Sequence, residues 1–229
     1  MSDAILVTGG SGAIGRAIAR RAAAEGWRVL NLDQRPPEDP LPAEDFFACD
    51  VADAAAFRAV LAGIVARHAP TRLVNNVGIV RPATLEETRI EDLAAVLDVN
   101  LRSAVLASQA LLPAMRAAGF GRIVNISSRA ALGKEVRTAY AASKAGLLGL
   151  TRSWALELAA DGITVNAIGP GPIATELFRR ANPDNSPRTR AIIEGVPVKR
   201  LGTPEDVAHG CAGFLDHRAG FITGQVLYV

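Results

Sequence analysis

Tyr140 and Lys144 are the two side chains in this sequence best suited to acid–base chemistry. They stand four residues apart near the start of a helical pattern, so both lie on one face of the helix, one turn from each other. A free phenol is a poor base near neutral pH because its reference pKa is about 10. A neighbouring ammonium favours the phenolate, but a pKa near 7 requires roughly 4 kcal/mol of preferential stabilisation. Taken alone, the pair is best interpreted as an ordinary helical pair.

A glycine-rich stretch near the start of the chain is the second chemical signal. The run I-L-V-T-G-G-S-G-A-I-G, residues 5–15, passes from a strand pattern through a turn into a helical pattern at 14–24. Gly10, Gly12 and Gly15 spell G-x-G-x-x-G, which lets a pyrophosphate approach the backbone while the amides at the helix start point at the anion. A tight structural turn is the alternative interpretation of these glycines.

Asp33 favours the ligand interpretation. It ends a second strand pattern, 28–32, and lies 18 residues past Gly15. An acidic side chain at that point can accept hydrogen bonds from the ribose hydroxyls of a dinucleotide, and it repels a 2′-phosphate. The sequence therefore predicts a dinucleotide site that prefers NAD, with NADP less favoured.

The composition is that of one soluble globular domain. The chain has 229 residues, of which 49% are hydrophobic and 21% are charged, and its net charge of +2 implies no particular partner. Basic residues are too scattered to indicate nucleic acid, and no stretch reaches membrane-spanning length without polar interruption. Cys49 and Cys211 lack metal-ligand spacing, so we expect no metal site and two free thiols. The early first strand leaves no room for a secretory leader, and we expect a cytoplasmic protein.

Strand and helix patterns alternate along the whole chain. Because the strand segments are apolar nearly throughout, they indicate a parallel sheet covered by helices on both faces. We predict an α/β fold with a single domain, 1–229, built on a doubly wound parallel sheet of about seven strands. Strand patterns lie at 4–7, 28–32, 46–49, 72–75, 122–126, 163–168 and 227–229, and helical patterns at 14–24, 53–67, 86–118, 139–160 and 204–215.

Two proline-containing segments qualify this pattern. Four prolines within residues 34–42 forbid a regular helix there, so we expect an exposed crossover. Pro113 falls inside the helical pattern 86–118, where it either kinks the helix or starts a new one.

Polar clusters follow the predicted strands, at the positions where each strand ends. They lie at residues 8–15, 33, 50, 75–78, 127–128 and 169–175. In open α/β sheets, ligands bind outside the carboxyl ends of the strands. We therefore expect these clusters to meet at one edge of the sheet.

The clusters contain motifs by which the chain resembles the classical short-chain dehydrogenase/reductases over essentially its whole length. The matching residues are T-G-G-S-G-A-I-G at 8–15, Asp50, N-N-V-G at 75–78, Asn100, N-I-S-S at 125–128, Y-A-A-S-K at 140–144 and P-G-P-I-A-T at 170–175. This resemblance implies a Rossmann-type fold and hydride transfer between a nicotinamide and an alcohol or carbonyl. Relatives commonly form tetramers through the long helices.

The resemblance also implies roles for single residues. Tyr140 would be the general acid/base, and Lys144 would lower its pKa, helped by a bound cationic nicotinamide, and hold the nicotinamide ribose. Ser128 would hydrogen-bond the reacting oxygen, because it matches the last position of N-I-S-S, and its neighbour Ser127 would be structural. Asn100 would support a water relay. Cofactor contacts are implied for Gly9, Ser11, Gly12, Ala13, Ile14, Gly15, Asp33, Asp50, Val51, Asn76, Gly78, Tyr140, Lys144, Pro170, Gly171, Ile173 and Thr175.

The substrate is left open by the sequence. Residues 170–200 are expected to form a variable lid, with Phe178, Ile192, Ile193 and Val196 as its apolar face. Arg129 and Arg137 flank the catalytic segment and can bind a carboxylate or phosphate, although solvated surface arginines are the simpler interpretation. We expect an NAD-dependent dehydrogenase of a secondary alcohol, with a 3-oxoacyl thioester reductase and a non-catalytic dinucleotide-binding sensor or scaffold as alternatives.

The long helical patterns predict self-association. Apolar positions on them exceed what one face of a sheet needs, and exposed apolar stripes of that size usually mark an interface. We expect a homodimer or homotetramer; the alternative is that these side chains belong to the core. The positions concerned are Leu101, Val105, Leu147, Leu150 and Leu158.

Overall fold

Seven parallel strands form the centre of the molecule, in the order β3-β2-β1-β4-β5-β6-β7. The computed structural model describes residues 3–184 and 186–229. The order reverses direction between β1 and β4, which makes this the topological switch point of a doubly wound sheet. The predicted fold class is therefore confirmed. The strands are β1 (Ala4–Thr8), β2 (Arg28–Asp33), β3 (Glu44–Ala48), β4 (Arg72–Asn75), β5 (Gly121–Ile126), β6 (Ile163–Gly169) and β7 (Val226–Tyr228).

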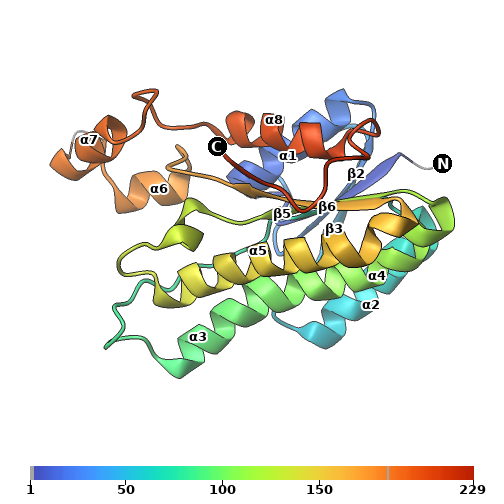
Figure 1. Ribbon diagram of the computed structural model, residues 1–229, viewed down its shortest axis with the longest axis horizontal. Coiled ribbons are helices and arrows are strands. Elements are labelled where there is room, and N and C mark those ends of the chain that lie inside the picture. The colour runs from blue at the N-terminus through green and yellow to red at the C-terminus, as the bar shows by residue number, and fades with distance from the viewer. Residues whose placement is uncertain (1–2, 185) are drawn as a thin grey trace.

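Helices cover both faces of the sheet (Figure 1). One face carries α1 (Ala13–Ala24) and α8 (Pro204–Leu215), and the other carries α2 (Ala54–His68), α4 (Ser103–Ala118) and α5 (Thr138–Leu158). Every residue of β1, β4, β5 and β6 is buried, which explains why these strands are apolar nearly throughout. Leu147 and Leu158 belong to the core rather than to an exposed stripe, because they are only 1% and 4% exposed; the prediction that they face a partner is wrong.

The helix starts follow rules that can be read in the sequence. Asp53 accepts hydrogen bonds from the backbone amides of Ala55 and Ala56 at the start of α2. Thr203 and Asp206 form a reciprocal capping box at the start of α8, with Pro204 at its first position. These caps fix where the chain enters each helix.

The predicted helical segment 86–118 contains an irregularity that the sequence did not reveal. The segment consists of α3 (Ile90–Leu97), a five-residue π-helix η1 (Asp98–Arg102), and α4, and the π-helix is the irregularity. Pro113 lies inside α4 and does not start a new helix. Single π-helical turns are frequent at functional sites, and this one contains Asn100.

This same helical run, Ile90–Ala118, is 29 residues long and apolar enough to cross a membrane by length and composition alone, with a mean hydropathy of 1.2 in its best window. Half of that window is buried inside the fold. A core helix of a globular domain gives the same signal, and this run packs against the sheet (Figure 1).

The crossover from β2 to β3 contains no helix, as its prolines predicted. Residues 34–43 follow an irregular path and are mostly exposed. Parallel strands are normally joined by a crossover that includes a helix. Here the edge strand β3 is reached through a short, irregular segment instead. Polar contacts of Asp39 and Glu44 hold this segment in place.

The carboxyl ends of the strands and residues 170–200, predicted to form a lid, lie at one end of the molecule (Figure 1). The segment between β6 and α8 forms α6 (Glu176–Ala181) and α7 (Pro187–Glu194). The opposite edge is closed by the buried Arg72 and Arg122, whose guanidinium carbons lie 5.0 and 4.3 Å from the centre of the Phe120 ring. The edge that is left open is therefore the one at the carboxyl ends of the strands, where the polar clusters were predicted to meet.

Candidate active site

The glycine turn after β1 has the shape that a dinucleotide requires. Gly9 has a φ of +68°, which favours glycine, and a Cβ on Gly15 would lie 2.1 Å from the Gly9 carbonyl oxygen. The turn therefore closes tightly against the start of α1. At Gly12 the surroundings are open, because a Cβ there would meet only the Gly9 oxygen, at 3.6 Å. Gly12 caps α1 without a side-chain bond, so the first amides of this helix are available to phosphate oxygens.

Asp33 lies beside this turn at the end of β2. Its Oδ2 accepts a hydrogen bond from the Ser11 amide at 3.1 Å, and its Oδ1 faces the Arg35 amide at 3.4 Å. The carboxylate is half-buried and keeps acceptor capacity for a ribose hydroxyl. The residues present thus fit an NAD(P) molecule, whose pyrophosphate the turn would receive and whose adenosine ribose Asp33 would hold.

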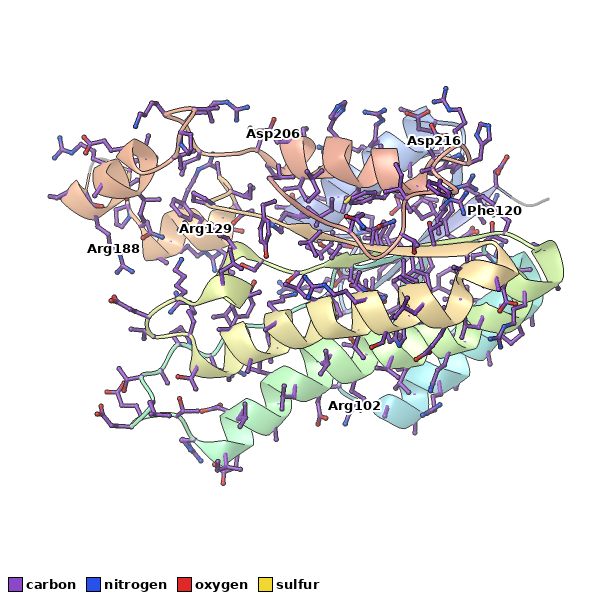
Figure 2. All side chains as sticks on the ribbon, viewed as in Figure 1. Arg102, Phe120, Arg129, Arg188, Asp206 and Asp216 are labelled. Carbon is purple, nitrogen blue, oxygen red and sulfur yellow. The ribbon has the colours of Figure 1, made fainter. Side chains whose placement is uncertain are left out.

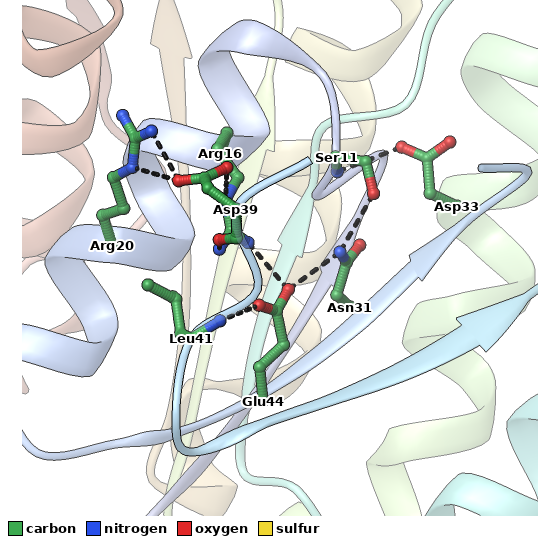
Figure 3. A network of polar contacts seen from close by, with 8 residues as sticks. All are labelled: Ser11, Arg16, Arg20, Asn31, Asp33, Asp39, Leu41 and Glu44. Atoms are coloured by element: carbon green, nitrogen blue, oxygen red, sulfur yellow. Dashed lines mark hydrogen bonds and ion pairs between the residues drawn. The ribbon is translucent and has the colours of Figure 1, made fainter. Parts of the chain in front are cut away.

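A buried polar network supports the turn from below (Figure 3). Asn31 Nδ2 donates to Ser11 Oγ at 3.0 Å and to Glu44 Oε1 at 2.9 Å, and that same carboxylate accepts from Arg16 Nη1 at 2.7 Å. The side chains of Arg16 and Glu44 are 6% and 2% exposed, so each charge is satisfied almost entirely by the other and by the groups around it. The pair joins α1 to the start of β3.

The network continues into the helix-free crossover. Arg16 Nε donates to Asp39 Oδ1 at 2.9 Å, and Arg16 also donates to the Asp39 carbonyl. Arg20 Nε donates to Asp39 Oδ2 at 2.9 Å, and the Leu41 amide donates to Glu44 Oε2 at 2.8 Å. Asp39 and Glu44 therefore hold residues 34–43 onto α1 in place of a packed helix.

Asn76, predicted to touch the cofactor, holds the other side of the turn. Its Nδ2 donates to the carbonyls of Thr8 and Gly9, at 3.0 Å each, and its amide donates to Thr8 Oγ1 at 3.1 Å. Because β1 and β4 are neighbours at the switch point, these bonds lock the glycine turn to the end of β4.

Lys144 is buried where β5 ends. It is 3% exposed, and its Nζ donates to the Ile126 carbonyl at 2.8 Å and lies 5.7 Å from the centre of the Tyr140 ring. Burial lowers the pKa of Lys144 to about 8. A Cβ on Gly78 would stand 3.2 Å from the Lys144 Nζ, so a glycine at 78 gives the ammonium its room.

Asn100 is fixed by three hydrogen bonds. Its Oδ1 accepts from the Ile79 amide at 2.7 Å, and its Nδ2 donates to the Ile79 carbonyl and to Ser143 Oγ, at 3.0 Å each. Asn100 is 1% exposed, so these bonds satisfy a buried amide. They join the π-helix to the loop after β4 and to the helix that contains Lys144.

Tyr140 and Ser128 face each other at the mouth of the site. Burial raises the pKa of Tyr140, and a hydrogen bond with Ser128, followed by the charge of Arg137, opposes that rise. Ser128 Oγ also accepts from the Ala130 amide at 3.1 Å at the start of a short 3₁₀ helix, η2 (Arg129–Leu132). The adjacent Ser127 is 2% exposed and donates to the Lys144 carbonyl at 2.7 Å, so it faces the core.

Comparison with known proteins agrees with this geometry. A family model described as enoyl-(acyl carrier protein) reductase matches residues 9–229. An acetoacetyl-CoA reductase from Rhizobium meliloti is 41% identical, with 99% of this chain and 96% of the relative covered. A 3-oxoacyl-[acyl-carrier-protein] reductase from Escherichia coli is 36% identical, with 98% and 94% covered. This chain is a short-chain dehydrogenase/reductase.

The likeness extends to the crystal structure of a protein from Beutenbergia cavernae that is assigned as an NAD(P)-dependent gluconate 5-dehydrogenase. It superimposes with a TM-score of 0.93 at 34% identity, with 98% of this chain and 94% of that chain covered, and it holds NADP at low occupancy. The present short-chain dehydrogenase/reductase is accordingly an oxidoreductase that acts on an alcohol or ketone with NAD(P).

The remaining predicted cofactor residues of this short-chain dehydrogenase/reductase have local structural partners. Asp50 Oδ1 accepts from the Ala52 amide at 2.9 Å, and Val51 is buried. The Pro170 carbonyl accepts from the Arg129 amide at 2.9 Å, and the Gly171 amide donates to the Val229 carbonyl at 2.7 Å. Ile173 is buried and bridges to Gly202, Thr175 caps α6, and Ala13 and Ile14 begin α1.

Other residues of the site were missed from the sequence. Arg16, Asn31 and Glu44 were not singled out, although a polar Asn31 within an apolar strand pattern was a signal. Asn75 and Asn125 lie in the matching motifs, yet they are bonded to each other at 2.8 Å between β4 and β5. Among residues 3–184 and 186–229, no three His, Cys, Asp or Glu side chains are arranged to hold a metal ion.

Proposed function

We propose that this protein reduces the keto group of a 3-oxoacyl thioester to a secondary alcohol. The identity to acetoacetyl-CoA and 3-oxoacyl reductases over nearly the full length of both chains supports this assignment. The observation that carries it is the Tyr140 environment. Because burial raises the pKa of Tyr140, the phenol is protonated at neutral pH and ready to donate to a carbonyl oxygen.

In this proposal each residue has one task. Ser128 Oγ donates a hydrogen bond to the keto oxygen, and Tyr140 gives that oxygen its proton as the alcohol forms. Lys144 supplies a positive charge that stabilises the phenolate left on Tyr140, and Asn100 holds Ser143 and the loop after β4 so that this helix face keeps its position. A bound NAD(P)H supplies the hydride.

We further propose that NADH is preferred over NADPH. The Asp33 carboxylate beside Ser11 suits ribose hydroxyls and repels a 2′-phosphate. Arg35 is exposed in the proline-containing crossover. Position 12 on the turn is a glycine, so the turn itself offers no positive charge to a 2′-phosphate.

Oxidation of a secondary alcohol by NAD is the second candidate. The structural likeness to an assigned gluconate 5-dehydrogenase, with a TM-score of 0.93 at 34% identity, favours it. The two candidates share Tyr140, Ser128 and Lys144 and differ in substrate and direction.

An assay of NADH oxidation and NAD reduction across several substrates tests the proposal. We expect NADH oxidation with acetoacetyl-CoA at a kcat/KM well above that with simple ketones, and slower NAD reduction with gluconate or secondary alcohols. Tyr140→Phe should retain NADH binding, followed by its fluorescence, and lower kcat by about 10²–10⁴. Turnover of gluconate but not of the thioester would favour the second candidate, and binding without turnover of any substrate would indicate a non-catalytic sensor.

A further inference from the structure

A single side chain joins the loop after β3 to the helical turn that contains Asn100. Arg102 is the last residue of the π-helix η1 and lies on the side of the molecule that carries α2 and α4 (Figure 2). Its Nη2 donates to the Ala52 carbonyl at 2.7 Å, and its Nη1 lies 2.7 Å from Asp98 Oδ1 in the same turn. Because Ala52 and Arg102 are 50 positions apart in the sequence, their bond is a tertiary link between two parts of the site.

The loop after β3 lies beside Asp33, which would hold the adenosine ribose. Ala48 at the end of β3 is the register partner of Asp33, and the Cys49 amide donates to the Asp33 carbonyl at 2.9 Å. Further along this loop, Asp50 Oδ1 accepts from the Ala52 amide at 2.9 Å, so both peptide groups of Ala52 are bonded. The position of the Ala52 carbonyl therefore depends on a loop at the adenosine end of the cofactor site.

The other side of η1 is bonded to the helix that carries Tyr140 and Lys144. Asn100 Nδ2 donates to Ser143 Oγ at 3.0 Å, and Ser143 Oγ donates to the Tyr140 carbonyl at 2.8 Å. Asn100 is also bonded to the amide and the carbonyl of Ile79. Because Asn100 and Ser143 are both buried, a displacement of η1 would be passed directly to the first turns of α5.

Arg102 is held more firmly than a solvated surface arginine. Its side chain is 36% exposed, yet its Nε is buried, and no acceptor within residues 3–184 and 186–229 bonds that nitrogen. A partly exposed ion pair such as the one with Asp98 contributes little to stability, whereas a buried donor without a partner is costly. The bond to Ala52 is therefore the contact that holds the guanidinium against the loop after β3.

We propose that Arg102 is a positioning residue, which couples the adenosine end of the bound cofactor to the catalytic end through η1. The adenosine portion holds the loop at 50–53, the Ala52 carbonyl fixes Arg102, and the fixed turn holds Asn100 against Ser143. An enzyme gains rate when binding energy from a non-reacting part of a ligand orients the reacting part. This coupling requires a bound NAD(P) cofactor and does not depend on which ketone or alcohol reacts.

Two fragments of the cofactor test the coupling. NMNH contains the reacting nicotinamide, and 5′-AMP contains the adenosine end; 2′,5′-ADP replaces 5′-AMP if the wild type prefers NADPH. The test variant is Arg102→Met, which keeps an apolar stem and removes every donor, and Arg102→Lys restores a charged donor. Asp98→Asn is the matched control, because it removes the ion pair within η1 and leaves the bond to Ala52.

Calorimetric titration measures how each fragment affects the binding of the other. In the wild type we expect 5′-AMP to tighten NMNH binding on the order of tenfold. Arg102→Met should bind each fragment alone nearly as well as the wild type and lose most of this enhancement, Arg102→Lys should regain part of it, and Asp98→Asn should keep it. No enhancement in the wild type, an enhancement that survives in Arg102→Met, or an equal loss in Asp98→Asn would overturn the proposal.

Hydrogen exchange of backbone amides gives a second readout, which also requires no turnover. In the wild type we expect 5′-AMP to slow exchange at residues 8–15, 50–53 and 98–103. In Arg102→Met the first two segments should remain protected, while 98–103 should exchange as in the free protein. Protection of 98–103 that persists in this variant would contradict the coupling. A failure to reduce any thioester would contradict the proposed function and leave both binding measurements unaffected.

Discussion

Burial acts in opposite directions on the two titratable groups of the catalytic set. Burial lowers the pKa of Lys144 to about 8 because the ammonium loses its hydration. It raises the pKa of Tyr140 because a phenolate there would likewise lose its hydration. At neutral pH the phenol is protonated, while the lysine is charged but close to its titration range. Small changes of pH above neutrality therefore change the charge of this site.

The pH dependence of the reaction follows from these two directions. Lys144 is charged below about pH 8 and loses its proton above that value, so the support for a phenolate on Tyr140 weakens as the pH rises. We expect kcat for ketone reduction to be flat near neutral pH and to fall above roughly pH 8. We expect the rate of alcohol oxidation to rise with pH, because the small fraction of Tyr140 present as phenolate grows even though the phenol stays mostly protonated. Steady-state rates in both directions between pH 6 and 10 check this. A reduction rate that climbs steadily through pH 9 would contradict it.

The adjacent serines offer a matched pair of substitutions. Ser128→Ala removes the hydroxyl that interacts with Tyr140, and we expect kcat to fall by about 10²–10³ with little change in melting temperature. Ser127→Ala removes a buried bond to the Lys144 carbonyl, and we expect a loss of about 1–2 kcal/mol in the free energy of unfolding with most activity retained. Kinetics and thermal unfolding of both variants separate the roles. The reverse pattern would transfer the oxygen-binding role to Ser127.

Cofactor preference is also decided by single residues. Asp33→Ala removes charge-assisted hydrogen bonds worth roughly 1.5–3 kcal/mol, so NAD(H) should weaken while NADP(H) gains. Gly12→Arg in the same background should extend the change, because a side chain at position 12 has open space and a φ of −76° that any residue adopts. The measurement is kcat/KM with both cofactors in wild type and the two variants. A wild type that already prefers NADPH, or a ratio that Asp33→Ala leaves unchanged, would refute the assignment of Asp33.

At the scale of elements, the crossover from β2 to β3 is stabilised differently from an ordinary βαβ unit. Polar contacts from Asp39 and Glu44 to α1 replace the apolar face of a helix. Glu44 is bonded at the same time to Asn31, which holds Ser11 on the glycine turn. The stability of the crossover and the geometry of the cofactor turn therefore depend on one carboxylate.

Two neighbouring carboxylates on β3 test this link. Glu44→Gln removes the buried charged partner of Arg16 and leaves it only the half-exposed Asp39, and we expect weaker NADH binding, by about tenfold, with kcat at saturation nearly unchanged. Asp45→Asn is the matched control, because Asp45 pairs with the half-exposed Arg28 away from the turn. Fluorescence titration with NADH, alongside thermal unfolding, distinguishes the two. Equal losses of NADH affinity in both variants would show that Glu44 acts only through general stability.

The elements themselves were largely predictable, whereas their tertiary polar contacts were not. The apolar run of β6 and the cap at Asp53 are local features, so the sequence indicates the strand and the helix start directly. The π-helix around Asn100 leaves no local signal, because the sequence there is an ordinary helical pattern. The partners of Glu44 lie 13 and 28 residues away, and no periodicity predicts such pairs. Motif residues such as Tyr140 and Lys144 were found because the chemistry itself restricts their types and spacing.

At the scale of the whole molecule, the helices opposite α1 and α8 expose apolar surface. Leu156 on α5 is 86% exposed, while Leu101, Val105 and Leu150 are half-buried. Between α2 and α4 lies a shallow cavity of about 470 Å³ whose lining is mainly apolar, formed by Arg58, Leu61, Ala62, Val65, Ala66, Leu106, Gln109 and Ala110. Apolar area that remains exposed on one side of a domain is typical of a surface used for association.

We therefore predict that the protein is a homodimer or homotetramer that associates through the outer faces of α4 and α5. Leu156→Arg places a charge at the most exposed leucine of this surface, where a desolvated charge without a partner is strongly unfavourable, so the oligomer should dissociate at micromolar concentration. Light scattering coupled to size exclusion measures the mass, and Leu85→Arg, at a position 80% exposed outside these helices, is the control. Activity should survive in the Leu156→Arg monomer, because the four proposed catalytic side chains come from one chain. A monomeric wild type, or equal dissociation by both variants, would contradict the prediction.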